Sequence, residues 1–156
     1  MPSAPIFRPY QPADLAACLA LFDGNCPEFF APNERADYVE FLAPVPAGYE
    51  VCLLGKKIVG AFGVLREAHG LSLRWIHVSP DAQGRGLGRT IMARVVAAVR
   101  AHGGEPLHIA ASQKSAPFFS KFGAKEVRRT PDGWGPGMHR VDLLLPSAPP
   151  GLSADG

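Results

Sequence analysis

The sequence has no long apolar run, few cysteines and little net charge, and each shortage excludes a class of protein. No stretch of about 18 apolar residues occurs, so we expect no membrane-spanning helix. The first residues, Met1 to Pro5, lack a basic segment followed by an apolar one, so we expect no secretory signal. Cys18, Cys26 and Cys52 are odd in number and match no metal-ligand spacing, which predicts no metal site and favours a cytoplasmic location.

The net charge of +2 hides an uneven distribution along the chain. Residues 1–70 hold 5 basic and 8 acidic side chains, whereas residues 71–156 hold 11 basic and 6 acidic ones. The second half suits a ligand that carries several phosphates. A nucleic-acid-binding protein would have a denser basic patch with interleaved aromatic residues, so we do not expect nucleic acid as a partner.

With 156 residues, 47% of them hydrophobic, the chain has enough apolar material for one domain. We expect this domain to span residues 1–145. The remaining residues, 146–156, follow Pro146 with nothing to bury, and we expect a disordered tail there.

A glycine-rich turn is the most informative segment of the chain. Residues 76–90, Ile-His-Val-Ser-Pro-Asp-Ala-Gln-Gly-Arg-Gly-Leu-Gly-Arg-Thr, read as a strand, a tight turn and the start of a helix. Glycine lets the backbone approach a ligand closely, and a helix N-terminus offers unpaired N–H groups to an anion. The spacing is not that of a P-loop, and Arg89 stands where the dinucleotide-binding fingerprint has its third glycine. The turn therefore predicts a different kind of pyrophosphate site.

The spacing Gln83-x-x-Gly86-x-Gly88, after a strand that ends at Val78, resembles the acetyl-CoA loop of the GNAT N-acetyltransferase superfamily. Residues 112–124, Ser-Gln-Lys-Ser-Ala-Pro-Phe-Phe-Ser-Lys-Phe-Gly-Ala, look like the family's N-x-x-A-x-x-F-Y-x-x-x-G-F segment. The resemblance covers roughly residues 5–145. It implies an enzyme that uses acetyl-CoA as co-substrate and moves the acetyl group to a primary amine by direct attack in a ternary complex.

Periodicity and turn signals predict the elements in the order βααβββαβαββ. This is an α/β protein of the α+β type, with a mixed, mostly antiparallel central sheet flanked by helices, as the resemblance also implies. Leu15, Leu19 and Phe22 mark the buried face of the first helix. In the second helix we expect Asn33 as N-cap, with Val39 and Leu42 buried. The strands are expected at residues 6–9, 49–54, 57–65, 71–78, 107–111, 125–129 and 139–145, and the helices at 12–22, 33–43, 86–102 and 115–122.

The resemblance also assigns the residues that contact acetyl-CoA. Main-chain groups of Ile76, His77 and Val78 would pair with the pantetheine arm, and an N–H near Val78 would serve as oxyanion donor. The phosphates would lie on the turn, and the downstream segment would complete the site. The assigned residues of these two regions are Gln83, Gly84, Arg85, Gly86, Leu87, Gly88, Arg89 and Thr90, with Ser112, Ser115, Phe118 and Phe119.

The acid and the base of the reaction stay open at this level. Phe119 stands where the family has a tyrosine that protonates the leaving thiolate. Ser112 is then a candidate acid, a water is another, and the sulfur could also depart as thiolate. Ser72 stands where some members have a glutamate that acts as the general base, so the base candidates are His77, Glu28 and Glu34.

The acceptor is not identified by any motif. Residues 23–40 contain five acids and one base, which would favour a cationic small-molecule or peptide amine if this region borders the site. The chain length and composition do not decide between a monomer and a homodimer. A second reading is a catalytically silent acyl-CoA-binding or sensor domain, since the phosphate turn is intact while the usual proton-handling residues are replaced.

Overall fold

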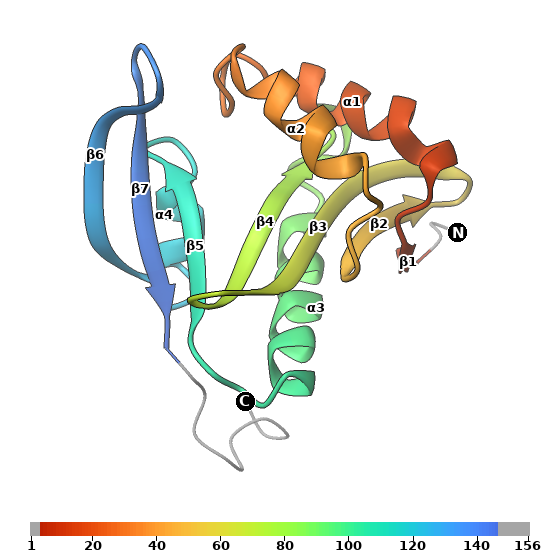
Figure 1. The fold of residues 1–156 in the computed structure, drawn as a ribbon. Helices are drawn as coiled ribbons and strands as arrows, with labels where there is room; N and C mark the ends of the chain where they lie inside the picture. Colours follow the sequence, from red (N-terminus) through yellow and green to blue (C-terminus); the bar gives the residue numbers. More distant parts are fainter. Residues whose placement is uncertain (1–3, 147–156) are drawn as a thin grey trace.

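The computed structural model describes residues 4–146, which form a seven-stranded sheet with helices on both faces (Figure 1). The strands are β1 (Ile6–Pro9), β2 (Tyr49–Leu54), β3 (Lys57–Glu67), β4 (Gly70–Val78), β5 (Leu107–Ser112), β6 (Lys125–Gly135) and β7 (Met138–Leu145). The helices are α1 (Leu15–Gly24), α2 (Glu34–Leu42), α3 (Leu87–Ala101) and α4 (Ala116–Ser120), with short 3-10 turns at Pro12–Asp14 and Pro80–Ala82. The predicted fold class and element order are confirmed.

The strands lie in the order β1-β2-β3-β4-β5-β7-β6, and only β4 and β5 pair in parallel. A parallel neighbour needs a crossover connection, and α3 supplies it. Helices α1 and α2 cover one face of the sheet on the β1–β4 side, while α3 and α4 cover the other face. Figure 1 shows β4 and β5 diverging toward one end of the sheet.

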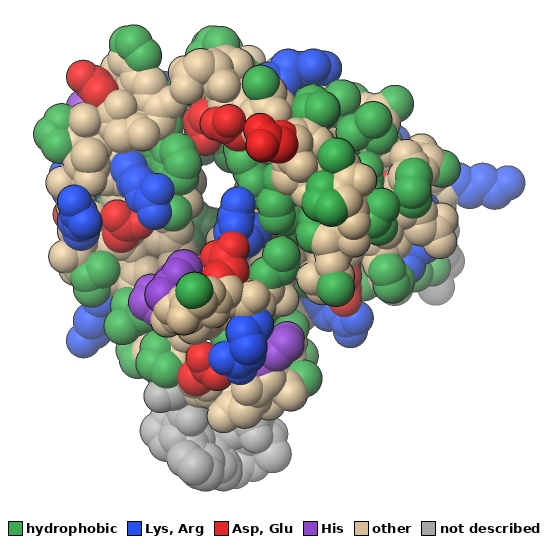
Figure 2. All heavy atoms as spheres, in the orientation of Figure 1, with side chains coloured by type: hydrophobic (Ala, Val, Ile, Leu, Met, Phe, Trp, Pro, Cys, Tyr) green, Lys and Arg blue, Asp and Glu red, His purple; other side chains and the backbone are tan. Residues whose placement is uncertain are grey.

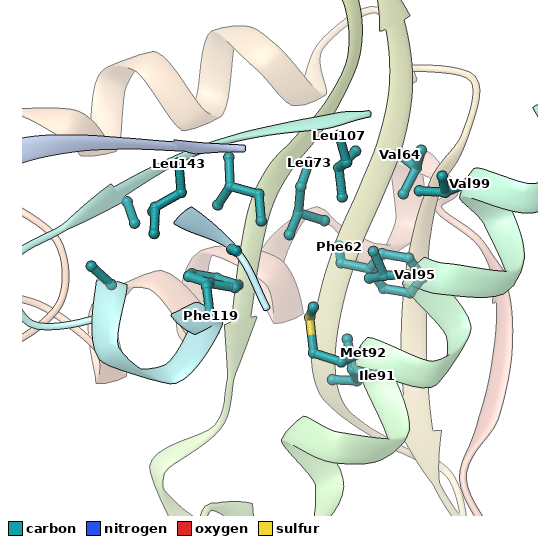
Figure 3. Packing of buried hydrophobic residues seen from close by; sticks show 14 of the residues in the cluster. Phe62, Val64, Leu73, Ile91, Met92, Val95, Val99, Leu107, Phe119 and Leu143 are labelled. Atoms are coloured by element: carbon teal, nitrogen blue, oxygen red, sulfur yellow. The ribbon is translucent and has the colours of Figure 1, made fainter. Parts of the chain in front are cut away.

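The larger core lies between the sheet and α3. Ile91, Met92 and Val95 form one fully buried stripe of this helix, as its helical spacing predicts. They pack against Phe62 of β3, and the same cluster continues through the sheet residues to Phe119 of α4 (Figure 3). This continuous apolar contact fixes α3, and with it the glycine turn, against β3 and β4.

The smaller core, between the sheet and α1 and α2, is largely aromatic. Phe22 of α1 and Tyr38 of α2 are buried and lie with their rings 6.1 Å apart. Tyr49 of β2 is buried beneath them, and Trp75 of β4 packs against the Tyr38 ring at 4.8 Å. Buried tyrosines bring hydroxyl groups that need partners, so this core contains a polar network within an apolar cluster.

Several local predictions require correction. Leu15 is 38% and Val39 37% exposed. The buried residues of α1 are Cys18, Leu21 and Phe22, and the buried stripe of α2 runs through Tyr38 and Leu42, four residues apart. Asn33 occupies the N-cap position without capping the helix, since its side-chain amide donates instead to the carbonyl of Trp134 at 2.7 Å. β6 is also longer than predicted and extends to Gly135.

Within residues 4–146, no helix is long and apolar enough to cross a membrane. The predicted tail, 146–156, lies outside the described residues apart from Pro146.

A buried carboxylate joins β1 to α1. Both oxygens of Asp14 accept hydrogen bonds from the Arg8 guanidinium, at 2.8 and 2.9 Å, and the Gln11 N–H donates to one of them at 2.9 Å. Asp14 is 5% exposed. The guanidinium bonds hold the pKa of this carboxyl below its usual range.

We expect Asp14→Asn to lower the free energy of unfolding at pH 7 by about 1–3 kcal/mol, because a charge-assisted, bidentate contact is lost. A carboxyl with a lowered pKa stabilises the fold above its unfolded-state pKa, so the difference should vanish as the pH falls below roughly 4. Urea unfolding at several pH values measures this. The exposed Glu126–Arg129 pair provides the control, and Glu126→Gln should change stability by less than about 0.5 kcal/mol.

Candidate active site

A cleft opens where β4 and β5 separate. The two strands pair only from Leu71 to Leu73 and from Leu107 to Ile109, and beyond this point their backbones diverge. The cavity between them has a volume of about 570 Å³. Figure 2 shows it as an opening between the two halves of the molecule, with acidic side chains at the rim on the α2 side. A cleft of this size can hold an extended ligand between the strands.

Most of the predicted site residues meet at this cleft. Those that line it are Ile76, His77, Val78, Gln83, Gly84, Gly88, Ser112, Ser115, Phe118, Phe119 and Glu34. Those outside its lining are Glu28, Arg85, Gly86, Leu87, Arg89 and Thr90. Asn25, Lys114 and Trp134 also line it, although no sequence motif assigned them to the cofactor.

A β-bulge shapes the β4 wall of the cleft. Between the pairs Ala61–His77 and Gly63–Arg74, β3 contributes one residue and β4 contributes two. The first bulged residue, Trp75, has φ +46°, a left-handed conformation that tryptophan rarely adopts. A bulge redirects the backbone groups that follow it, so the segment after Trp75 presents its amides differently from a regular strand.

The register of β3 and β4 decides which amides face the cleft. Ser79 donates its N–H to the Val59 carbonyl at 2.8 Å, and His77 lies two positions earlier, opposite Ala61. Bonded and non-bonded pairs alternate along an antiparallel ladder, so His77 exchanges its backbone hydrogen bonds with Ala61. The backbone groups of Val78 therefore point away from β3. By this register the main-chain groups of His77 are engaged with β3, whereas those of Val78 are not.

The carbonyl of Val78 is held by two side-chain amides. Asn25, at the end of α1, and Gln83, in the glycine turn, each donate to it at 2.9 Å. Asn25 also donates to the Leu21 carbonyl at 2.8 Å and accepts from Gln83 at 3.0 Å. The Gln83 side chain thus joins the glycine turn to the end of β4. Asn25 is 3% exposed, and its only sequence signal is an amide directly after an apolar helix.

The glycine turn has the geometry of an anion site. Gly84 and Gly86 have φ values of +81° and +77°, and a Cβ on either residue would meet no atom within 4 Å, so the space in front of the turn is open. α3 begins directly after Gly86, and no side chain caps its first N–H groups. Arg85 and Arg89 are exposed and take part in no salt bridge within residues 4–146. The turn therefore fits a diphosphate, with its backbone amides as donors and two arginines beside them.

The remaining residues of this region have packing roles. Leu87 and Phe119 are buried in the main core, and Thr90 donates its hydroxyl back to the Gly86 carbonyl at 3.2 Å. A Cβ on Gly88 would lie 3.1 Å from the Phe118 ring, so glycine here permits contact between the start of α3 and α4. Phe119 offers no proton donor at the cleft.

Ser112 and Ser115 close the turn before α4. The Ser112 hydroxyl oxygen accepts from the N–H groups of Lys114 and Ser115, at 3.2 and 3.3 Å, and lies 3.3 Å from the Ser115 hydroxyl. The Ser115 hydroxyl accepts in turn from the Ser112 N–H at 3.0 Å. These bonds fix both side chains in a local turn.

Glu34 is a buried carboxylate that lines the cleft from its α2 side. It begins α2, is 5% exposed, and accepts one hydrogen bond at Oε2 from the Ala31 N–H at 2.7 Å. Burial raises the pKa of its carboxyl to about 7, and the nearby charge of Asp37 adds to the increase. Its other oxygen, Oε1, bonds to no group within the described residues. A carboxyl poised near neutrality is suited to accept a proton.

The other two candidate bases are less suitable. Glu28 is exposed and lies outside the cleft lining. His77 is 5% exposed, and burial lowers the pKa of its imidazole to about 3, so it stays neutral and is a weak base. Its Nε2 lies 2.9 Å from the Tyr38 hydroxyl.

A hydrogen bond bridges the two walls of the cleft at its acidic end. Asn33, next to Glu34, donates to the Trp134 carbonyl, and Trp134 in turn donates its Nε1–H to the Ala111 carbonyl at 2.8 Å. The Arg140 guanidinium lies over the Trp134 ring at 5.0 Å. The turn between β6 and β7 is therefore fixed across the site.

Comparisons with known proteins agree with this geometry. The family model described as "Acetyltransferase (GNAT) domain" matches residues 47–133, from β2 to the far end of β6. No curated protein matches the chain.

Solved structures match along nearly the whole chain. A Desulfovibrio desulfuricans protein assigned to the GNAT family shares 25% identity, with 93% of this chain and 100% of that chain covered and a TM-score of 0.72. The ribosomal-protein-S18-alanine N-acetyltransferase of Escherichia coli shares 15% identity, covering 96% and 99%, with a TM-score of 0.74. A Salmonella typhimurium acetyltransferase-type protein, solved with acetyl-CoA, shares 17% identity, covering 96% and 99%, with a TM-score of 0.72.

Homologues with this fold bind acetyl-CoA or coenzyme A, and the match to the family model spans more than half of the sequence. The protein with the splayed β4–β5 cleft and the glycine turn is a member of the GNAT acetyltransferase family.

Proposed function

We propose that the protein transfers an acetyl group from acetyl-CoA to a primary amine by direct attack in a ternary complex. One observation carries this proposal: a single cleft is lined both by glycines at the start of α3 and by the buried carboxylate of Glu34 at the start of α2, two helices that cover opposite faces of the sheet. The first can hold a diphosphate, and the second can accept the proton of an ammonium group. We place this activity in one domain that spans residues 1–145.

In this proposal the backbone of the chain holds the co-substrate. The amides of Gly84, Gly86 and the first turn of α3 bind the diphosphate, and Arg85 and Arg89 add charge-assisted hydrogen bonds. The free main-chain edge after the β4 bulge takes the pantetheine arm, with the Val78 N–H as a donor to the carbonyl oxygen. Acetyl-CoA, when bound, supplies a thioester whose acyl carbon is open to attack by an amine.

Glu34 acts as the general base. Its carboxylate removes a proton from the incoming ammonium group, so that the nitrogen lone pair can attack. The C–N bond forms, the C–S bond breaks, and the bonding electrons leave with the sulfur. General-base assistance of this kind contributes a factor of about 10²–10⁴ to the rate.

The leaving thiolate needs no side-chain acid. Phe119, at the position of the family's usual acid, has no proton to donate. A thiol has a pKa near 8.5, so the thiolate is a tolerable leaving group and takes a proton from the attacking nitrogen or from water.

The acceptor in this proposal is a cationic small-molecule or peptide amine. Glu34 and Asp37 both lie in the first turn of α2. Acidic side chains gather at the rim of the cleft on that side (Figure 2). A positively charged amine is attracted to this rim and pairs with Glu34 before it loses its proton.

A thiol-release assay with acetyl-CoA and a panel of amines tests the proposal. Turnover of at least one cationic amine supports it. Tight binding of acetyl-CoA with no turnover on any amine would instead support an acyl-CoA-binding or sensor domain.

The glycine turn gives a sharp prediction for co-substrate binding. We expect Gly86→Asp to abolish acetyl-CoA binding, because a carboxylate would stand where the phosphates lie and repel them. Gly104 at the other end of α3 also has φ +77° and open space around its Cβ, so Gly104→Asp imposes the same backbone strain away from the site. Calorimetric titration with acetyl-CoA should show normal affinity in the Gly104 variant. If both variants bound acetyl-CoA with equal affinity, the assignment of the diphosphate to this turn would be wrong.

The proposed base predicts a pH dependence. A base works in its ionised form, so kcat/KM should rise with pH through about 7 as Glu34 loses its proton. Glu34→Gln should lower kcat by about 10²–10⁴-fold and remove this inflection. Glu40→Gln, an exposed change on the same helix, should leave the profile intact. A Glu34→Gln enzyme with a wild-type profile would assign the base to another group.

The same substitution should stabilise the fold at high pH. The pKa of Glu34 is higher in the folded than in the unfolded state, so the folded state binds more protons and stability falls as the pH rises from about 4.5 to 7. At pH 8 the folded protein contains a buried charge, and Glu34→Gln removes it. We expect the free energy of unfolding to increase by about 1–3 kcal/mol at pH 8 and to change little at pH 4. Urea denaturation at both pH values measures the difference.

A further inference from the structure

A chain of buried hydrogen bonds ends on the β4 bulge. The Tyr49 hydroxyl donates to the Trp75 carbonyl at 2.7 Å. The Tyr38 hydroxyl lies 2.7 Å from the Tyr49 hydroxyl and 2.9 Å from Nε2 of His77. Tyr38, Tyr49 and His77 are 0%, 1% and 5% exposed, so water does not compete for these bonds. No part of the reaction proposed above uses either tyrosine.

The directions of these bonds follow from counting protons. The Trp75 carbonyl can only accept, so the single hydroxyl proton of Tyr49 is used there. Tyr49 must then accept the proton of Tyr38, and Tyr38 must accept from His77. His77 is therefore neutral with its proton on Nε2. Its Nδ1 keeps a bare lone pair, which agrees with Nδ1 being the buried side-chain atom without a partner in residues 4–146.

The last hydrogen bond of this series, from the Tyr49 hydroxyl to the Trp75 carbonyl, controls the geometry of the cleft wall. The Trp75 carbonyl and the Ile76 N–H belong to one planar trans peptide, so they point in opposite directions. Tyr49 fixes the direction of the carbonyl from the α2 side of the sheet, and it thereby fixes the N–H of Ile76. A left-handed tryptophan at φ +46° persists only when its surroundings over-determine it. The Tyr49 bond and the packing of Trp75 on Tyr38 at 4.8 Å provide this support.

We propose that Tyr49 and Tyr38 are positioning residues. By holding the β4 bulge they fix the Ile76 N–H and the direction of the strand after it, which carries the Val78 N–H proposed above as donor to the thioester carbonyl. This inference rests on the proposed acetyl transfer. Neither tyrosine touches the substrates. Each acts through the next member of the chain, with Tyr49 orienting the peptide and Tyr38 fixing both the Tyr49 proton and the His77 tautomer. Removing the Tyr49 hydroxyl frees the bulged peptide to rotate, whereas removing the Tyr38 hydroxyl leaves the Trp75 bond in place.

Another tyrosine of the aromatic cluster, Tyr10, provides the control for Tyr49→Phe. Tyr10 is 4% exposed and packs edge-on against Tyr49, with ring centroids 6.1 Å apart, but its hydroxyl takes no part in the chain. Tyr10→Phe therefore makes the same chemical change in the same core as Tyr49→Phe. It controls for the loss of a buried hydroxyl from this core without breaking a bond of the chain.

The main experiment requires no knowledge of the acceptor. Acetyl-CoA labelled with ¹³C at the acetyl carbonyl is bound to each variant, and its chemical shift reports how strongly the carbonyl is polarised. We expect a displaced signal in the wild type and in Tyr10→Phe. In Tyr49→Phe the signal should return toward that of free acetyl-CoA while the calorimetric affinity stays unchanged. On an amine that the wild type acetylates, kcat should fall roughly 10- to 100-fold with an unchanged KM for acetyl-CoA.

A second measurement, made on the protein without ligand, tests the donor-to-acceptor direction of the hydrogen bonds in this chain. Nitrogen-15 spectra of the histidines should show His77 as the Nε2–H tautomer in the wild type and in Tyr10→Phe. In Tyr38→Phe the two tautomers should mix, because Nε2 loses its acceptor. This measurement also stands if Tyr49→Phe fails to fold, since Tyr38→Phe keeps the bond to Trp75.

The outcomes separate this inference from the proposed function. An Nδ1–H tautomer in the wild type, or a Tyr49→Phe variant that retains the displaced carbonyl signal, would overturn the positioning role even when acetyl transfer is intact. A wild-type protein that shows the Nε2–H tautomer but never binds acetyl-CoA would overturn the proposed function and leave the hydrogen-bond chain in place.

Discussion

The separation of β4 from β5 is the constraint on which the rest of the site depends. Two paired strands satisfy each other's backbone groups, and these two stop pairing after Leu73 and Ile109. The amides beyond that point need other partners, since buried backbone groups rarely remain unpaired. The protein supplies some of them, with Tyr49 on the Trp75 carbonyl and with Asn25 and Gln83 on that of Val78. By the β3–β4 register the Val78 N–H points away from β3, and a ligand can pair with it as an added strand would.

The two cores, one on each face of the sheet, stabilise different borders of the β4–β5 cleft. α3 packs through an aliphatic stripe against β3 and β4, which fixes the start of the helix and so the glycine turn. α1 and α2 pack through aromatic rings, and Tyr38 and Tyr49 bring hydroxyl groups into that layer. An aliphatic core packs tightly without polar groups, whereas the tyrosine hydroxyls add directional hydrogen bonds to the aromatic core. The polar network therefore lies on the side where the acceptor amine is proposed to enter.

Burial sets different roles for the acidic and basic groups around the cleft. Glu34 and His77 are both 5% exposed, yet burial raises the pKa of the carboxyl to about 7 and lowers that of the imidazole to about 3. Desolvation disfavours the charged form in both cases, and the result is one group that can exchange a proton near neutrality and one that stays neutral. The same effect explains why a histidine in the sequence motif is a poor guide to the base in this chain.

The sequence by itself determined the element order and the location of the glycine turn. Apolar periodicity and turn residues are local signals, and the stripe of Ile91, Met92 and Val95 and the glycines at 84 and 86 are read from neighbouring positions. It did not determine the exposure of Leu15 and Val39, nor the partner of Asn33, because these depend on which face of a helix meets the sheet. Only the tertiary structure decided that Glu34 is buried beside the cleft and that Tyr49 reaches the Trp75 carbonyl, 26 residues away. Solvation and hydrogen-bond geometry arise from groups that are distant in the chain, so no local pattern encodes them.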